Sequence, residues 1–402
     1  MDPSGSGKSF LVNSIVEQYL GYNMDVVIID TGHSYSGLCA YFGGKYITYS
    51  EESPITMNPF AISEAEYNIE KKDFLCTLIG LAWKGADGEL GTVERDVIAS
   101  VISAYYSSWF SGEQKIDELK FDTFYEFACQ RIPGIKATER ISFDLEEFRY
   151  VLKKYSKGGE FEALLNEQAD QSLFLERFIV FEIDAIKGHR ILFPLVTLII
   201  MDVFIQKMRN RTNRRKALIV EEAWKAVSSP LMSGQLVYLY KTVRKFWGEV
   251  MVVTQELGDI VGNAVVKDSI IANSDTFFLL DQSKFRDRFD EIAALLSINE
   301  VERRKIFTIN QLDNKEGRSR FKEVYIRRGS SGEVYGVENA LHQYLIYTTE
   351  KPEKSAVEGY VSRHGSYRSG LDAFVADLKS SGMQLPEFVT KVNQSVAWSS
   401  GN

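Results

Sequence analysis

A glycine-rich run, PSGSGKS, occupies residues 3–9 and directly precedes apolar residues at helical spacing. Gly5 and Gly7 allow the backbone to curl so that successive N–H groups point at phosphate oxygens, which a Cβ atom would obstruct. Lys8 would bring a positive charge to the β- and γ-phosphates, and the Ser9 hydroxyl would bind Mg²⁺. The helix that follows would direct its positive end at the same anion. The run therefore predicts a phosphate-binding loop, with an ordinary Gly/Ser turn before a helix as the alternative.

We expect this loop to bind ATP and Mg²⁺. The residues expected to contact the nucleotide are Ser4, Gly5, Ser6, Gly7, Lys8, Ser9 and Phe10. The full pattern, G-x-x-x-x-G-K-[ST], places its first glycine on Asp2, and the sequence has no apolar strand leading into the loop. We therefore expect a fragment of a longer protein that lacks this strand, with Met1 and Asp2 as added residues. That loss would weaken or abolish nucleotide binding.

The composition is that of an ordinary globular protein. The 402 residues suggest two or three domains, with 45% apolar and 25% charged residues. A net charge of −8 means that any contact with nucleic acid or an anionic membrane is local. Four histidines and three widely spaced cysteines argue against a zinc enzyme and indicate a reducing, cytosolic compartment; these cysteines are Cys39, Cys76 and Cys129.

Two apolar segments that end in acidic residues are expected to be buried parallel strands. Residues 25–30 end at Asp30, where open α/β sheets place their ligands; the alternatives for Asp30 are a catalytic or metal-orienting role and a helix cap. Residues 217–220 end at Glu221 and Glu222, as in a Walker B strand. Glu221 would hold Mg²⁺ through water, and Glu222 would polarise the attacking water.

Residues 250–253 predict a further buried strand, which ends at Thr254 and Gln255. The Gln255 amide is placed to sense the γ-phosphate, and a capping role is the alternative. Later strands are expected at residues 277–280 (the last core strand), 325–328, 334–337 and 345–348.

The spacing of apolar residues and the polarity of each segment divide the chain into four parts. Residues 1–62 and 176–350 read as two parts of a P-loop NTPase core, which is α/β with a mostly parallel sheet. Residues 63–175 have apolar residues at helical spacing and predict an all-helical insertion. Residues 351–402 form a more polar C-terminal tail with one amphipathic stretch, which packs on a neighbour or is partly disordered.

The most apolar run, residues 191–205, contains Pro194 and Asp202 and predicts a buried helix rather than a membrane span. Six cations follow within residues 207–216. They could contact nucleic acid or lipid phosphate. A solvated loop is the alternative, because a loop that enters a parallel strand lies at the end of the sheet opposite the nucleotide.

Taken together, the motifs resemble those of the VirB-four/TraC family of conjugation and type IV secretion ATPases, most closely the TraG-type proteins of Bacteroides-like conjugative elements. The similarity extends to about residue 350. Two departures are Asp2, where glycine is expected, and Glu221, where many relatives carry aspartate. The matching motifs are PSGSGKSF at 3–10, VVIID at 26–30, MNPF at 57–60, LIVEEAWK at 218–225, TVRK at 242–245, VVTQE at 252–256 and IIANSDTFFLL at 270–280.

The resemblance implies a RecA-like motor that assembles as a homo-hexamer with ATP at the subunit interfaces. Arg244, with Lys245 as a second candidate, would act as an arginine finger in the neighbour's site, beside the catalytic residues Lys8, Glu222 and Gln255. The motor would lie at the cytoplasmic face of the inner membrane. There it would contact inner-membrane components of a secretion channel, power channel or pilus assembly or substrate transfer, and be coupled to DNA only indirectly. A HerA/FtsK-like DNA translocase and a nucleotide-binding scaffold that does not hydrolyse ATP are the alternatives.

Overall fold

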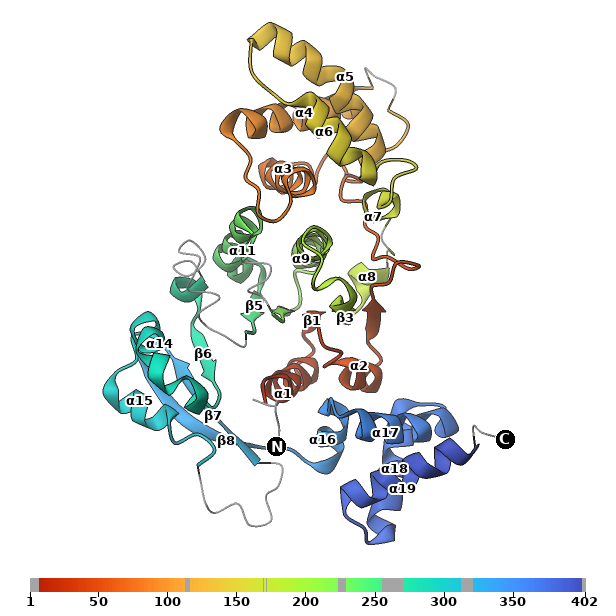
Figure 1. The fold of residues 1–402 in the computed structure, drawn as a ribbon, viewed down its shortest axis with the longest axis vertical. Coiled ribbons are helices and arrows are strands. Elements are labelled where there is room, and N and C mark those ends of the chain that lie inside the picture. Colours follow the sequence, from red (N-terminus) through yellow and green to blue (C-terminus); the bar gives the residue numbers. More distant parts are fainter. Residues whose placement is uncertain are drawn as a thin grey trace.

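The computed structural model describes residues 7–112, 116–168, 170, 172–222, 229–254, 270–311 and 321–399. Its centre is a five-stranded sheet with the strand order β2-β3-β1-β4-β5, in which every neighbouring pair is parallel (Figure 1). The predicted mostly parallel sheet is therefore confirmed. Its strands are β1 (Asp25–Asp30), β2 (Lys45–Thr48), β3 (Phe178–Glu182), β4 (Lys216–Val220) and β5 (Gly248–Val252).

The register brings the carboxyl ends of neighbouring strands to one edge of the sheet. Asp30 at the end of β1 lies opposite Glu182 at the end of β3, and Ile29 lies opposite Val220 at the end of β4. Strands β1, β3 and β4 are buried along their whole length, as expected for apolar strands covered on both faces. The acidic residues that end these strands therefore meet at a single edge.

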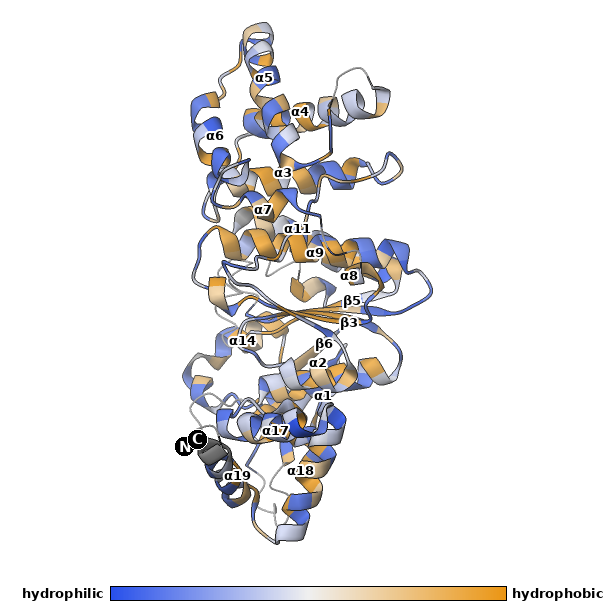
Figure 2. Cartoon of the chain, turned by 90° about the vertical axis from the view of Figure 1, so that its right-hand side faces the viewer, coloured by the Kyte–Doolittle hydropathy of each residue, from blue (hydrophilic) through white to orange (hydrophobic). Residues whose placement is uncertain are grey.

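Alternate residues of β1 point to opposite faces of the sheet and so enter two different cores. Val27 and Ile29 belong to the core formed with α9 (Leu192–Asn210) and α11 (Pro230–Thr242). Val26 and Ile28 belong to the core formed with α1 (Lys8–Gly21) and α2 (Ser36–Phe42). Figure 2 shows the sheet edge-on, as an apolar layer between these two sets of helices.

The segment between β2 and β3 is helical, as predicted, and no strand occurs among its described residues. Its helices are α3 (Ile69–Lys84), α4 (Thr92–Ser111), α5 (Phe121–Glu139), α6 (Leu145–Leu152), η1 (Lys153–Tyr155), α7 (Glu162–Asn166) and α8 (Ser172–Leu175). Helices α3 to α6 form the upper end of the molecule in Figure 1, beyond α9. Helix α9, the predicted buried helix, therefore lies between the sheet and this insertion.

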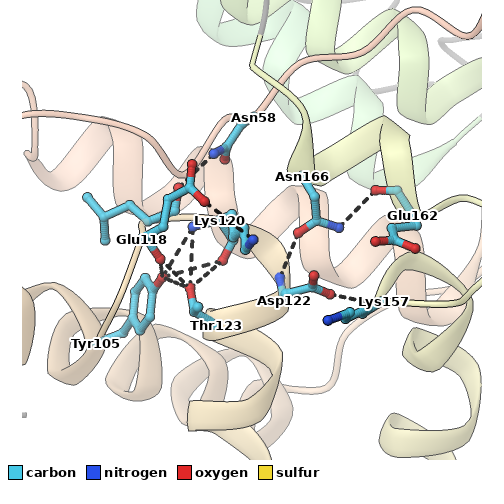
Figure 3. A network of polar contacts seen from close by, with 10 residues as sticks. Asn58, Tyr105, Glu118, Lys120, Asp122, Thr123, Lys157, Glu162 and Asn166 are labelled. Atoms are coloured by element: carbon cyan, nitrogen blue, oxygen red, sulfur yellow. Dashed lines mark hydrogen bonds and ion pairs between the residues drawn. The ribbon is translucent and has the colours of Figure 1, made fainter. Parts of the chain in front are cut away.

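Buried and partly buried hydrogen bonds hold the helical insertion together and attach it to the segment before it (Figure 3). Asn58, from the MNPF motif, donates from Nδ2 to the Leu119 carbonyl at 2.6 Å. At the start of α5, Asn166 accepts the Asp122 N–H at 2.8 Å, and Asp122 accepts the Lys157 N–H at 2.6 Å. The motif thus connects the first part of the core to the helical insertion.

A second sheet, antiparallel and with the order β6-β7-β8, lies beside the first. The prediction that residues 277–280 form the last core strand was wrong, because β6 pairs with β7 rather than with the parallel sheet and none of its residues is buried. The predicted strands at 325–328 and 334–337 are confirmed within β7 and β8. This unit consists of β6 (Thr276–Leu279), η4 (Ser283–Arg288), α14 (Phe289–Leu296), α15 (Glu300–Ile306), β7 (Phe321–Arg328) and β8 (Ser331–Glu338).

Helices follow the second sheet to the end of the described chain: α16 (Leu341–Tyr347), α17 (Lys351–His364), α18 (Tyr367–Ser381) and α19 (Leu385–Ser399). The prediction of a strand at 345–348 was wrong, since these residues lie in and directly after α16. The tail is a set of helices that packs on the rest of the protein. Leu371, Phe374 and Leu378 bury one face of α18 in the core that also contains residues of α1 and α2. Among the helices of the described chain, none has the length and apolarity that crossing a bilayer requires.

Candidate active site

The phosphate-loop residue Lys8 begins α1, a helix of 14 residues. Gly7, directly before it, has φ = 75°, a left-handed conformation that glycine adopts without strain. The Gly7 carbonyl accepts the Leu11 N–H at 2.9 Å and so starts the helix. Lys8 therefore lies at the positive end of α1, where an anion is stabilised. The loop residues Ser4, Gly5 and Ser6 lie outside the described residues.

Glu221 and Glu222 follow the last residue of β4. Glu221 is buried, and its N–H donates to the Ile29 carbonyl at 3.0 Å, which continues the pairing with β1. Glu222 turns the chain out of the sheet with φ = 49°, a left-handed conformation uncommon for a residue with a side chain. The strand thus ends in a sharp turn that presents two consecutive carboxylates at the edge of the sheet.

Electrostatics link Lys8 to both carboxylates. Partial burial lowers the pKa of the Lys8 ammonium, while the negative charges of Glu221 and Glu222 raise it. Burial raises the pKa of Glu221, and the Tyr35 hydroxyl and the Lys8 charge act in the opposite direction. Lys8 and the two consecutive glutamates are more than 200 residues apart in the sequence, yet their charges lie close enough to interact. Gln255, the fourth expected member, lies outside the described residues.

Two further buried carboxylates stand beside this site. Burial and the neighbouring Glu182 and Glu221 charges raise the pKa of Asp30 well above its ordinary value. Glu182 accepts the N–H groups of His33 at 2.7 Å and Asp184 at 2.8 Å. Sequence reasoning missed Glu182, although the apolar segment 178–182 ends in an acid as β1 does. This edge of the sheet carries an excess of negative charge that a cation would offset.

The donor set fits Mg²⁺. Glu221 and the Ser9 hydroxyl are hard oxygen ligands, and Mg²⁺ is usually held by one or two carboxylates together with substrate phosphate and water. Across the described ranges, no three His, Cys, Asp or Glu side chains are grouped to hold a metal by themselves. Phosphate oxygens of a nucleotide and water would supply the remaining ligands of a bound Mg²⁺.

A cleft of about 840 Å³ extends from Lys8 along β5. Helix α1 and strands β5 and β6 form its walls. The lining includes Leu11 and Ile15 of α1, Val250 of β5, Thr254 shortly after β5, and Phe278 of β6. Strand β5 is only partly buried and forms one edge of the parallel sheet in the described part of the chain. The cleft therefore follows the outer edge of β5, and the residue before Gln255 faces the same space as Lys8.

Arg244 also lines this cleft. It belongs to η3 (Val243–Phe246), which precedes β5, and its guanidinium pairs with Asp275 at 2.8 Å and donates to the Asn273 carbonyl at 3.1 Å. The strand between it and Thr254 has five residues and so spans roughly 16 Å. Arg244 therefore lies before the amino end of β5, and Thr254 lies after its carboxyl end.

Phe10, which we expected to contact the nucleotide, packs against aromatic rings. Its centroid lies 5.4 Å from those of Tyr344 and Tyr347 on α16. Next to it, the Ser9 carbonyl accepts a hydrogen bond from Asn13 Nδ2 at 2.7 Å. The ring contacts of Phe10 hold the first turn of α1 against α16.

Several cations of the basic stretch 207–216 form ion pairs or hydrogen bonds within the protein. Buried Asp25, at the start of β1, pairs with Arg211 at 3.1 Å and with Arg214 at 3.5 Å. The Lys207 ammonium donates to the Leu173 carbonyl at 2.9 Å. The stretch lies at the amino ends of the parallel strands, opposite the site, as the connectivity predicts.

Comparison with protein families matches residues 1–378 to the model described as the TraG P-loop domain. Protein TraC of Escherichia coli K12 is 22% identical over 264 residues, which are 64% of this chain and 28% of that protein. The type IV secretion system protein virB4 of Bartonella henselae is 24% identical over 293 residues, 72% of this chain and 34% of that protein. The chain thus spans about a third of the length of these relatives.

Solved structures show the same fold. VirB4 of Thermoanaerobacter pseudethanolicus aligns with a TM-score of 0.61 and 19% identity, over 85% of this chain and 88% of that one. The plasmid coupling protein TrwB in complex with ADP and Mg²⁺ aligns with a TM-score of 0.54 and 14% identity, over 87% and 85%. Since the family model covers nearly the whole sequence, this chain belongs to the TraG P-loop domain family.

Proposed function

We propose that this chain is the ATP-hydrolysing motor domain of a conjugative DNA-transfer, or type IV secretion, apparatus. The observation that carries the proposal is the convergence of Lys8, Glu221 and Glu222 at the carboxyl edge of a parallel sheet. The names of the relatives, which include a type IV secretion protein and a conjugal transfer protein, support the choice of apparatus. The narrower expectation of a Bacteroides-like element stays a prediction.

Each residue has a role that its position supports. Lys8, at the start of α1, binds the β- and γ-phosphates, and Ser9 and Glu221 hold Mg²⁺, directly or through water. When bound, Mg²⁺ neutralises charge on the phosphate oxygens. Glu222 orients the attacking water and accepts its proton. Gln255 is proposed as the γ-phosphate sensor, since Thr254 before it lines the same cleft as Lys8.

Assembly as a homo-hexamer is part of the proposal. Arg244 lies a strand's length from Thr254, and we assign it as an arginine finger in a neighbouring subunit. We place the ring at the cytoplasmic face of the inner membrane, in contact with the membrane components of a secretion channel. There it would power channel or pilus assembly or substrate transfer, and its coupling to DNA would be indirect.

Measuring the rate of ATP hydrolysis and the molar mass of the assembly on the same samples tests this proposal. Phosphate release is followed across a range of protein concentrations, and sedimentation with a non-hydrolysable ATP analogue gives the assembly state. The proposal expects hydrolysis per chain to rise as the assembly forms. Hydrolysis at full rate by a monomer would contradict the shared site, and nucleotide binding without any turnover would favour the scaffold alternative.

The DNA-translocase alternative gains no support from the basic stretch. Its cations at positions 211 and 214 are engaged by Asp25, at the end of the sheet away from the site. Salt-dependent binding of duplex DNA would nevertheless be the result that favours it.

A further inference from the structure

We propose that Tyr35 is a positioning residue that orients the carboxylate of Glu221 for Mg²⁺. This inference rests on the proposed nucleotide function and deepens it. Tyr35 follows β1 in the sequence and is fully buried, with 0% of its surface exposed. Its hydroxyl donates a hydrogen bond to Glu221 Oε1. None of the sequence motifs that predicted the site includes this tyrosine.

The loop that carries Tyr35 is held on both sides of the ring. On one side, the Ser34 N–H donates to Asp30 Oδ2 at 2.7 Å, which ties the loop to the end of β1. Lys354 of α17 donates to the His33 carbonyl at 2.7 Å on that same side, and to Ser36 Oγ at 3.0 Å on the other. The backbone on either side of Tyr35 is therefore fixed by the sheet and by the C-terminal helices.

Packing fixes the ring as well as the backbone. Tyr35 belongs to the core between the sheet and α1, α2 and the C-terminal helices, together with Leu38 and Ile346. Nearby, Gly37 lies so close to α16 that an added Cβ would come within 2.3 Å of the Ile346 carbonyl oxygen. Because neither ring nor loop can shift freely, the hydroxyl has a defined place at which to meet Glu221.

The surroundings of Glu221 explain why a neutral donor is needed there. Glu222 adds negative charge near this buried carboxylate. The Tyr35 hydroxyl donates to one carboxylate oxygen and so satisfies it without adding charge. With Oε1 occupied by this bond, Oε2 is the oxygen available to the metal or its bound water. Without the bond, the carboxylate is free to rotate toward Lys8.

The test compares two isosteric substitutions, Tyr35→Phe and Tyr325→Phe. The control is matched, because Tyr325 is equally buried and its hydroxyl donates to Glu302 Oε1 at 2.7 Å, in the second sheet. ADP binding is measured in EDTA and then across a Mg²⁺ titration, and phosphate release is measured at saturating nucleotide. For Tyr35→Phe we expect unchanged affinity for ADP in EDTA and a Mg²⁺ requirement raised about tenfold. Tyr325→Phe should keep the wild-type Mg²⁺ requirement.

The outcomes separate this inference from the function on which it rests. A wild-type Mg²⁺ requirement in folded Tyr35→Phe overturns the positioning role, and so does an equal rise in both variants. Replacement of Tyr35 by p-aminophenylalanine, which keeps a donor at the ring, should restore the wild-type requirement. If Tyr35→Phe does not fold, Glu221→Asp decides, because the shorter side chain withdraws the carboxylate from the hydroxyl; an unchanged Mg²⁺ requirement then overturns the role. If the Lys8→Ala variant binds ADP as tightly as the wild type does, the proposed function itself is overturned.

Discussion

The Lys71 ammonium lies 2.7 Å from the Asp202 carboxylate where α3 packs on α9, and both side chains are less than 7% exposed. Asp202 also accepts a hydrogen bond from Gln206 at 2.8 Å. Helix α9 covers the parallel sheet and α3 opens the helical insertion. One buried ion pair therefore joins the insertion to the layer that supports the active site.

Substitution of Lys71 by Met should destabilise the protein strongly. Breaking a buried pair leaves an uncompensated charge, which costs about 3–5 kcal/mol. We expect the free energy of unfolding to fall by that amount in urea denaturation followed by tryptophan fluorescence. The double variant Lys71→Met/Asp202→Asn, which removes both charges, should recover part of the loss. A change below about 1 kcal/mol in the single variant would show that the pair does not join the two layers.

Substitution of Glu222 by Gln should separate binding from turnover. The amide keeps the shape of the side chain but cannot accept a proton, so phosphate release should fall by about 10²-fold or more. ATP affinity should stay close to that of the wild type, and Glu387→Gln, an exposed change on α19, should leave both quantities unchanged. A parallel loss of affinity and rate would instead make Glu222 a structural residue or a metal ligand.

Arg211 and Arg215 provide a matched test of the basic stretch. Arg211 pairs with buried Asp25, whereas the Arg215 side chain is exposed. Arg211→Ala should lower the free energy of unfolding by about 2 kcal/mol, because it leaves Asp25 less compensated. Arg215→Ala should change it by less than about 0.5 kcal/mol. If both variants instead weaken salt-dependent DNA binding equally at unchanged stability, the stretch is a nucleic-acid surface.

Arg244→Ala tests the proposed arginine finger. It should remove the part of ATP hydrolysis that depends on assembly, about 10³-fold or more for an arginine finger, and leave nucleotide binding intact. Asp275→Ala removes the partner of Arg244 within the chain and serves as the control. If Arg244 acts only through that ion pair, the two variants will lose activity equally, and the finger is ruled out.

The parts of the fold that local patterns specify could be predicted from the sequence. The strand 25–30 is apolar throughout and ends in an acid, which is typical of a buried parallel strand, and the structure confirms it in β1. The run 191–205 is long and apolar but interrupted by Asp202, which favoured a buried helix. The structure gives that aspartate a cationic partner in Lys71.

The wrong or missing predictions concern features that depend on contacts between residues far apart in the sequence. Residues 276–279 are as apolar as a core strand, but only their pairing with β7 places them in a second sheet. Residues 345–347 are apolar and short, so periodicity does not distinguish strand from helix there. Tyr35 and Glu182 were missed at the site because their roles come from the register and packing of β1 and β3, which no motif encodes.

Equilibrium binding of Mg²⁺-ATP to Lys8→Ala tests the central claim, that Lys8 and the carboxylates after β4 form one nucleotide site. The control is Lys379→Ala, which removes the same charge from an exposed position on α18. We predict that Lys8→Ala loses Mg²⁺-ATP binding and phosphate release together, while Lys379→Ala matches the wild type. Retention of wild-type binding and turnover by Lys8→Ala would contradict the account.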